Sequence, residues 1–384
     1  MQNGCGILTL ARIRAGRIRV AEDLRLCVVA QREECGFRPG WIICRTTTTH
    51  GDNGDAIVAS KYAIGVDLGG TKILAAVVDA QGSVRAAAKK ATQAEKGPEA
   101  VINRIRKAMD EALDKAKLTK DRVAAIGIGA PGIIDSVNGV VISLTNLPGW
   151  HNIAIAQSLR RWHAVPVSLS NDVRVAAVGE HRVGAGLGVH SMIAVFVGTG
   201  IGGGIIVNDK PWVGFRSSAG EVGHMVILAD GPYAPGGGIR GGIEALASRS
   251  AIDRDLRAGI AAGRKSVLPD LLKEKGNDAI TSSVLAKAVS KNDPLTIEVL
   301  RRAAYYLGLH AASLINAFDP EMLVYGGGVI EALGEWMVAQ IRDVAKQHAI
   351  NRTGLDKVKI VEAKLGEQAG AIGAALMALD ALKA

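Results

Sequence analysis

The apolar positions of the chain follow two spacings from residue 62 onward. Runs rich in Val, Ile and Ala predict strands, and stretches with apolar residues three or four positions apart predict helices. In the first half we expect strands over 62–68, 73–79, 83–88, 123–128, 140–144 and 165–170, and helices over 98–116, 153–163 and 173–182. This alternation is typical of an α/β protein.

The same pattern starts again at Met192. An apolar strand over 192–197, a glycine turn over 198–204 and a returning strand from Ile205 repeat the order found at 62–79. Farther along we expect a loop over 217–242, a largely helical region over 243–319, strands over 321–325 and 358–362, and helices from 329 and over 367–382. Such an internal repeat predicts two lobes with a cleft between them.

The first repeated turn has the composition of a phosphate-binding loop. Gly69 and Gly70 let the backbone approach an anion, and Thr71 and Lys72 add a hydroxyl and a positive charge. Asp67 ends the preceding strand, where its carboxylate would face a metal ion. The turn therefore predicts a site for a phosphate and its cation.

The second turn matches the spacing of the dinucleotide fingerprint, but its context excludes that reading. The fingerprint must open a helix, whereas the residues after the turn read as a strand. The GxxxxGK[ST] motif is absent as well. We expect phosphate to be held by two β-turns, with a third glycine cluster at a helix start for the adenosine end. The candidate residues are Gly198, Thr199, Gly200 and Gly202 in the second turn, and Gly326, Gly327 and Gly328 in the third cluster.

Length and composition limit the class of protein. A chain of 384 residues is long enough for two domains, and 47 glycines fit a fold with many tight turns. No apolar run approaches the roughly 18–20 residues that cross a bilayer, and no secretory signal is found, so we expect a cytoplasmic protein without a membrane partner. The net charge of +9 is scattered, so no nucleic-acid partner is expected.

Residues 1–60 differ from the rest because they contain arginine but no lysine. The four cysteines, Cys5, Cys27, Cys35 and Cys44, all lie here without a CxxC pair, so we interpret them as free thiols. We expect a poorly ordered N-terminal extension. A small β element over 8–20 and a start codon assigned too early are the alternatives, and no helix-turn-helix spacing indicates a DNA-binding head.

In combination and order, these motifs resemble the ROK family (repressors, open reading frames and sugar kinases) of the actin-like ATPase superfamily. The resemblance covers nearly everything from Lys61 to Ala384 and rests on the segments 67–72, 129–132, 146–150, 171–172, 198–204, 221–224, 244 and 326–328. It implies a two-lobe actin-like ATPase (ribonuclease H-like) fold with a repeated βββαβαβα unit. The N-terminal lobe would cover 61–185, the C-terminal lobe 186–365, and the helix 366–382 would return to the first lobe.

The resemblance also implies a reaction, the ATP-dependent phosphorylation of a sugar, commonly glucose, by a homodimer. Asp172 follows directly after an expected strand, as a general base for the sugar hydroxyl would, and it matches the family's catalytic aspartate. A helix-capping role for Asn171 and Asp172 is compatible with the same position. By analogy Asp67 helps to hold Mg²⁺ indirectly and Thr199 bonds the transferring phosphate. The implied sugar-binding residues are Gly132, Asn146, Asn171, Asp172, Glu221, His224 and Glu244.

Two departures from the family pattern are evident. The family usually carries three zinc-binding cysteines after the Gly-His element, and here Pro235, Gly237 and Gly242 replace them. A structural zinc site needs four N or S ligands, which His224 alone does not supply, so we predict no structural zinc. Arg174 stands where family members often have a small amide.

We therefore expect a sugar kinase that uses ATP and Mg²⁺, most simply a glucokinase. Kinases for fructose, allose or an N-acetylhexosamine are alternatives, and so is a sugar-responsive transcriptional repressor. The repressor would need a DNA-reading head, for which residues 1–60 look too short and irregular. A catalytically lapsed sugar-binding protein is a third alternative, against which the retained Asp67, Asp172 and both glycine turns argue.

Overall fold

The computed structural model describes residues 62–144, 149–235 and 238–383. The chain divides into two compact units, residues 1–55 and 56–384, and only the second contains described residues. The expectations for residues 1–60, for Asn146 and for Gly237 lie outside the described residues.

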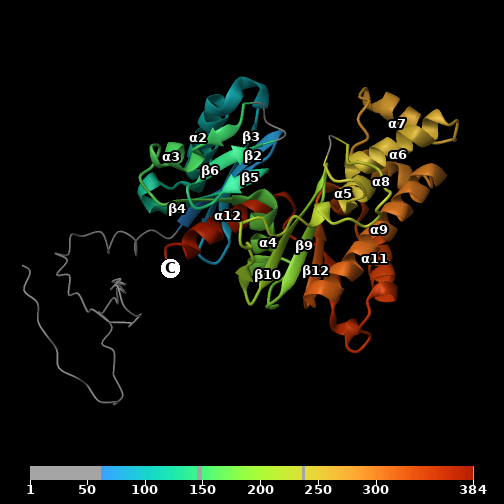
Figure 1. Cartoon of the computed structure of the whole chain (residues 1–384). Coiled ribbons are helices and arrows are strands. Elements are labelled where there is room, and N and C mark those ends of the chain that lie inside the picture. The colour runs from blue at the N-terminus through green and yellow to red at the C-terminus, as the bar shows by residue number, and fades with distance from the viewer. Residues whose placement is uncertain (1–61, 145–148, 236–237, 384) are drawn as a thin grey trace, which may run out of the picture. The chain divides into compact units, whose positions relative to one another are not determined.

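The first sheet has the strand order β3-β2-β1-β4-β8 (Figure 1). Its strands β1 (Tyr62–Leu68), β2 (Lys72–Asp79) and β3 (Val84–Ala91) form an antiparallel meander, and β4 (Val123–Ala130) and β8 (Val167–Asn171) extend it in parallel. Alternate residues of β1 pack on different helices: Ile64 and Val66 belong to the core with α2 (Gly97–Ala116), and Ala63 belongs to the core with α12 (Ala369–Asp380). Helices thus cover both faces of the sheet, which explains the continuous apolar run of β1.

The second sheet repeats this order as β11-β10-β9-β12-β13. The strands β9 (Met192–Val197), β10 (Ile201–Val207) and β11 (Lys210–Pro211) form the meander, and β12 (Met322–Gly326) and β13 (Lys359–Glu362) add the parallel pair. The internal repeat that the sequence predicts is confirmed by this topology.

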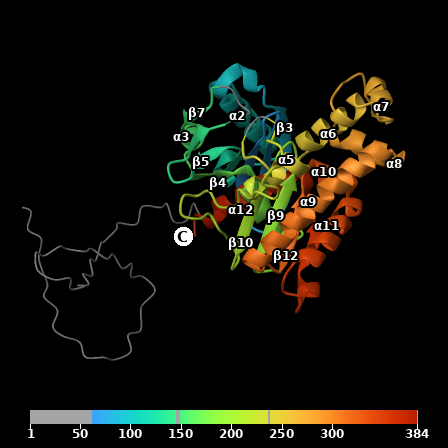
Figure 2. The ribbon, with the colours of Figure 1, turned by 45° about the vertical axis from the view of Figure 1, so that its right-hand side comes forward.

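A third, small antiparallel sheet contains β5 (Ile133–Asp135), β6 (Val140–Ser143) and β7 (His151–Ile153). Figure 2 shows the long helices of the second half, α9 and α11, side by side. The α-helices other than α2 and α12 are α3 (Ile155–Arg160), α4 (Asp172–Val183), α5 (Ile243–Ala247), α6 (Arg249–Ala261), α7 (Leu268–Lys275), α8 (Ser282–Ser290), α9 (Pro294–Phe318), α10 (Gly328–Leu333) and α11 (Glu335–His348).

The helices α4 and α12 join the two sheets. α12 packs on β1 and β4 of the first sheet, α4 packs on β10 of the second, and the two helices pack on each other. Their contact is close because glycine stands at it: a Cβ atom on Gly373 would lie 1.7 Å from the carbonyl oxygen of Val175. This packing brings the beginnings of both helices to the strand ends that carry the candidate site.

Several element boundaries differ from the sequence predictions, and two of the differences concern the small sheet and the second turn. The helix expected over 153–163 is shorter, because Ile153 pairs with Val141 in the small sheet and the helix begins only at Ile155. The turn expected over 198–204 ends at Gly200, and Gly202 pairs with Phe196 inside β10. Glycine is needed there because Val173 of α4 packs directly on it, with its Cγ2 atom 2.6 Å from where a Cβ of Gly202 would be.

None of the helices in the described part of the chain combines the length and the apolar character needed to cross a membrane.

Candidate active site

The first turn presents its polar residues at one end of β1 and β2. Gly69 donates its backbone N–H to the carbonyl oxygen of Lys72 at 2.9 Å, which closes the turn. The fully buried Thr92, directly after β3, holds the turn, because its hydroxyl donates to the carbonyl oxygen of Gly69 at 2.7 Å and its amide donates to that of Thr71 at 2.9 Å. Thr71 and Lys72 remain exposed at the surface. The backbone geometry of the turn is thus fixed without using the two side chains expected to bind phosphate.

Lys72 of the first turn forms an ion pair with Glu367, which lies directly before α12. The ammonium nitrogen of Lys72 lies 3.0 Å from Oε2 of Glu367, in the short turn η5 (Gly366–Gln368), and Lys89 pairs with the other oxygen of the same carboxylate. All three side chains are about half exposed, so the pairs are weak and open to exchange. An incoming phosphate would compete with Glu367 for Lys72.

Asn171 and Asp172 stand at the start of α4, and Asn171 caps it. Oδ1 of Asn171 accepts hydrogen bonds from the amides of Val173 at 3.0 Å and Arg174 at 3.2 Å, so Asn171 is the N-cap of α4. Asp172 is the first residue of the helix, and its Oδ1 accepts the amide of Val173 at 2.9 Å. Because Asn171 caps the helix, the second carboxylate oxygen of Asp172 is available for chemistry.

The carboxyl group of Asp172 interacts electrostatically with two others, those of Asp67 and Glu221. Burial raises the pKa of Asp67 to about 7, and the charge of Asp172 adds to the rise while Lys72 opposes it. Burial also raises the pKa of Asp172 to about 6, where hydrogen bonds from backbone amides oppose the rise and the charge of Glu221 adds to it. The strands, α4 and the loop before α5 thus bring Asp67, Asp172 and Glu221 together.

The carboxylate of Asp67 fits a role beside a divalent cation. Within the described residues it accepts no hydrogen bond, and α12 begins against it, since a Cβ on Gly370 would lie 2.8 Å from Oδ2 of Asp67. Carboxylate oxygens are preferred ligands of Mg²⁺ or of its bound water, and a cation would relieve the repulsion between Asp67 and Asp172. Mg²⁺, which accompanies ATP in solution, therefore suits a position beside Asp67 and Asp172.

The second turn is closed by a hydrogen bond of its own and is bound by two side chains from α5 and α6. Gly198 donates its amide to the carbonyl oxygen of Gly200 at 2.9 Å. Oε2 of Glu244, in α5, accepts the amide of Ile201 at 2.8 Å, and Nη2 of Arg249, in α6, donates to Oγ1 of Thr199 at 2.6 Å. Glu244, expected at the sugar, thus has one of its carboxylate oxygens on this turn.

The third glycine cluster lies against the second turn. Gly327 has a φ of +83°, and a Cβ there would lie 2.7 Å from the carbonyl oxygen of Val197, the residue before Gly198. Gly326 ends β12 and Gly328 begins α10. Gly132, with a φ of +81°, lies instead against β6, where its Cβ would be 2.3 Å from the carbonyl oxygen of Ser143.

Glu221 and His224 lie on a loop that is fastened to α4. Both side chains are exposed, with Nε2 of His224 3.9 Å from Oε2 of Glu221. The guanidinium of Arg174, a residue only 5% exposed, donates from Nη2 to the carbonyl oxygens of Ser217 at 2.9 Å and Ala219 at 3.1 Å. The loop that carries Glu221 is therefore held by the same helix that carries Asp172.

The segment that replaces the family's cysteines is held by its own backbone. Isolated bridges join Val226 to Gly242 and Tyr233 to Arg240. Nε of Arg240 also donates to the carbonyl oxygen of Gly231 at 2.9 Å. Among the described residues, no three His, Cys, Asp or Glu side chains gather into a set that would hold a metal ion.

Sequence reasoning missed three residues of this region. Thr92 and Glu367 contact the first turn, and Arg249 contacts the second. Thr92 and Glu367 lie far along the chain from the turn they contact, 23 and 295 positions away respectively, and their signal is only tertiary. Arg249 carries a weak signal, since a basic residue directly after the N-cap Ser248 opposes the helix dipole of α6.

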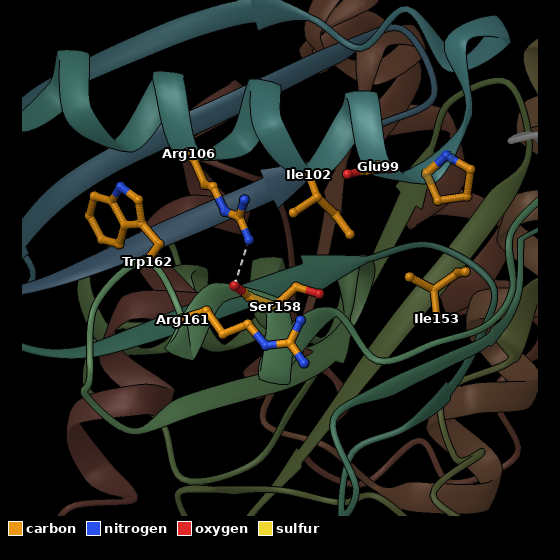
Figure 3. Close-up of a pocket in the computed structure, with 8 residues that line it drawn as sticks. Glu99, Ile102, Arg106, Ile153, Ser158, Arg161 and Trp162 are labelled. Carbon is orange, nitrogen blue, oxygen red and sulfur yellow. Dashed lines mark hydrogen bonds between the residues drawn. The ribbon is translucent and has the colours of Figure 1, made fainter.

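A cavity of about 560 Å³ lies elsewhere, between α2 and the region of α3. Figure 3 shows Arg106 reaching from α2 toward the carbonyl oxygen of Ser158, to which it donates at 2.7 Å, with Arg161 and Trp162 nearby. None of the candidate site residues lines this cavity.

Comparison with known proteins assigns these features to a family. The family model described as "ROK family" matches residues 63–381. A protein named glucokinase from Halalkalibacterium halodurans is 32% identical over 316 residues, which cover 82% of this chain and 94% of the relative. A xylose repressor from Caldicellulosiruptor bescii is 29% identical over 272 residues, covering 71% of this chain and 66% of the repressor.

A solved structure shows the same architecture. The ROK family glucokinase from Streptomyces griseus, crystallised with glucose and AMPPNP, superposes with a TM-score of 0.72 at 33% identity, over 83% of this chain and 99% of that one. The two repeated sheets have the actin-like ATPase fold, as the resemblance implied. From the family match over most of its length and this structural similarity, the chain belongs to the ROK family.

Proposed function

We propose that this protein is an ATP-dependent sugar kinase that phosphorylates a hexose, with glucose at its 6-hydroxyl as the substrate. The observation that carries the proposal is the placement of Asp172 at the start of α4, close to Asp67 and Glu221, with a pKa raised to about 6. A carboxylate with a pKa near the working pH is suited to general-base catalysis. The relatives named as glucokinases support the sugar as acceptor.

Asp172 accepts the proton of the attacking hydroxyl. One of its oxygens is held by the amide of Val173, which fixes the carboxylate. The other takes the proton as the sugar oxygen bonds to the γ-phosphorus of ATP, and the bond between that phosphorus and ADP breaks so that ADP leaves. Phosphoryl transfer needs little covalent help from the protein, so positioning and charge neutralisation supply most of the catalysis. The base alone contributes on the order of 10²–10⁴-fold.

Mg·ATP is the donor, with its phosphates between the two turns. The backbone amides of the first turn, Thr71, Lys72 and the hydroxyl of Thr199 bind phosphate oxygens, and Asp67 faces the cation that the nucleotide brings. The adenosine end is assigned to the glycines 326–328, which pack against the second turn and lead into α10. Lys72 exchanges its ion pair with Glu367 for phosphate when the nucleotide binds.

The sugar binds opposite the turns, on the loop that carries Glu221 and His224. Asp172 and Glu221 offer acceptors for its hydroxyls, and Glu244 offers the one oxygen not used by Ile201. Asn171 offers the N–H donors of its side-chain amide, because its Oδ1 is bound by the amides of Val173 and Arg174. Gly132 and Asn146 complete the proposed sugar contacts.

We assign residues 61–185, with the returning helix 366–382, to one lobe and 186–365 to the other, and we propose a cytoplasmic homodimer.

The decisive experiment is a coupled ADP-release assay over a panel of hexoses, including fructose, allose and N-acetylhexosamines. Glucose is expected to give the highest kcat/KM, and Asp172→Asn to reduce kcat by about 10²–10⁴-fold. Asp114→Asn, which alters an exposed aspartate of α2, is the matched control and should retain wild-type turnover. If no sugar stimulates ATP turnover, the kinase assignment is wrong. A higher kcat/KM with another hexose would replace glucose as the substrate.

The similarity to a xylose repressor keeps a sugar-responsive regulator as the second candidate. A regulator would bind a sugar without turning over ATP, so the same panel, read by calorimetry as well as by ADP release, separates the two functions.

A further inference from the structure

Arg249 is attached to the second turn through both its backbone and its side chain. It is the first residue of α6, and its amide donates to the carbonyl oxygen of Gly198 at 2.9 Å. Its Nη2 donates to the hydroxyl oxygen of Thr199 at 2.6 Å. The hydroxyl of Ser250 also donates to the carbonyl oxygen of Thr199 at 2.8 Å. Since the backbone and Ser250 already fasten α6 to the turn, the guanidinium is not needed for that attachment.

Most of the hydrogen-bonding capacity of this guanidinium is unused. An arginine has five N–H donors. In the part of the chain that the structure describes, the Thr199 hydroxyl is the one group that receives a bond from the Arg249 side chain. A partly exposed guanidinium with free donors is matched in charge and geometry to phosphate oxygens.

The bond from Arg249 also decides what the Thr199 hydroxyl can do. A hydroxyl has one donor hydrogen and accepts through its lone pairs. Because Thr199 accepts from Arg249, its own hydrogen is directed toward another acceptor. The two side chains therefore present neighbouring donors, O–H and N–H, to a single anion.

The charge around the second turn requires such a cation. The segment 198–204 contains no lysine or arginine, and Glu244 places a carboxylate on the amide of Ile201. A phosphate at this turn would face the negative charge of Glu244, which the guanidinium of Arg249 would offset. Lys72 belongs to the other turn and is paired with Glu367.

We infer that Arg249 is a phosphate-binding residue of the nucleotide site, contacting a phosphate oxygen of Mg·ATP together with Thr199. The inference rests on the proposed function, in which this turn holds phosphate. It adds a cation from α6 that acts on the nucleotide and not on the sugar.

Binding of Mg·ATP and of adenosine to the full-length protein, measured by isothermal titration calorimetry, tests this role without requiring turnover. Arg249→Ala is expected to weaken Mg·ATP by about tenfold or more, the usual effect of losing a hydrogen bond to a charged group, and to leave adenosine within about twofold. Arg249→Lys, which keeps the charge but loses the planar fork, should fall between wild type and Arg249→Ala. Arg257→Ala removes an equal charge from the exposed face of the same helix, where Arg257 pairs with Asp253 at 3.0 Å, and should bind Mg·ATP as wild type does.

The inference is overturned if Arg249→Ala binds Mg·ATP within twofold of wild type, or if it loses adenosine to the same extent. Should Arg249→Ala fail to fold, as judged by thermal unfolding, Arg249→Lys decides, and wild-type affinity there overturns the inference. Arg249-dependent Mg·ATP binding without any sugar-stimulated turnover upholds the inference and overturns the proposed reaction. A wild-type protein that binds no Mg·ATP overturns both.

Discussion

Nη2 of Arg174 donates a hydrogen bond of 2.9 Å to the carbonyl oxygen of Ser217. Arg174 is in the first turn of α4, two residues after Asp172, and Ser217 is four residues before Glu221. The bond therefore links the helix that presents the proposed base to the loop that presents a proposed sugar contact. Ser217 has a φ of +56°, a conformation that non-glycine residues rarely adopt, so the loop needs such external support.

Arg174→Gln is expected to raise the KM for the sugar by about tenfold. The substitution removes the two hydrogen bonds that the buried guanidinium donates to carbonyl oxygens, so the loop 217–221 moves. The KM for ATP should stay within about twofold. Hydrogen exchange measured by mass spectrometry should show faster exchange over 213–221. Arg182→Gln, at the other end of α4, where Arg182 pairs with Asp380 at 2.6 Å, is the matched control. Equal sugar KM values in the two variants would refute the positioning role.

The pH dependence of the reaction should reflect the raised pKa values of Asp67 and Asp172. The base must be ionised to accept a proton, so kcat is expected to fall below pH about 6, the pKa of Asp172. In the free enzyme Asp67 has a pKa of about 7. As the pH is lowered, kcat/KM for Mg·ATP should therefore begin to fall at a higher pH than kcat does. Initial rates measured from pH 5 to 9 give the pH dependence of both kcat and kcat/KM. If kcat and kcat/KM fell at the same pH, or if kcat fell only near pH 4, the roles assigned to Asp172 and Asp67 would be contradicted.

Asp67→Asn is expected to stabilise the protein without nucleotide at alkaline pH. The pKa of Asp67 is about 7 in the folded state against 3.8 normally, so its cost to stability is absent below pH about 4 and grows as pH rises to about 7. Since one pKa unit corresponds to about 1.4 kcal/mol, the effect on the free energy of unfolding is expected to be on the order of a few kcal/mol.

Thermal unfolding of Asp67→Asn and wild type at pH 4, 6 and 8 measures this difference, with Asp114→Asn as the control. An Asp67→Asn variant no more stable than wild type at pH 8 would show that the carboxyl does not carry this cost.

Gly373→Val should destabilise the protein by about 3 kcal/mol or more, because α4 and α12 would have to separate to admit the side chain. Urea unfolding measures the loss. Gly263→Val is the control, since a Cβ there meets no atom within 4 Å, although its φ of +80° adds a smaller backbone cost. Similar losses at the two positions would argue against the close helix contact.

Metal analysis of the purified protein tests the expected absence of structural zinc. The loop 226–242 is held by backbone bridges and by Arg240, so chelator treatment should leave its thermal stability unchanged. One tightly held zinc ion per chain would refute the prediction.

The sequence by itself determined most of the elements, because local apolar spacing specifies them, and the order of its motifs carried the resemblance to the ROK family. Apolar periodicity located most strands and helices, and the two Gly/Thr turns after apolar strands identified the repeat. Asn171 and Asp172 were found for the same reason, since a polar pair between a strand and a helix is a local signal.

Only the tertiary structure decided which distant groups meet at the site. Nothing in the sequence places the carboxylate of Glu244 on the amide of Ile201, the guanidinium of Arg249 on Thr199 or that of Arg174 on the loop before Glu221. These contacts depend on how helices pack on sheets, and a close approach such as that at Gly373 is set by the shapes of two surfaces far apart in the chain. The pKa values of Asp67 and Asp172 follow from the same packing, because burial and neighbouring charge exist only in the folded protein.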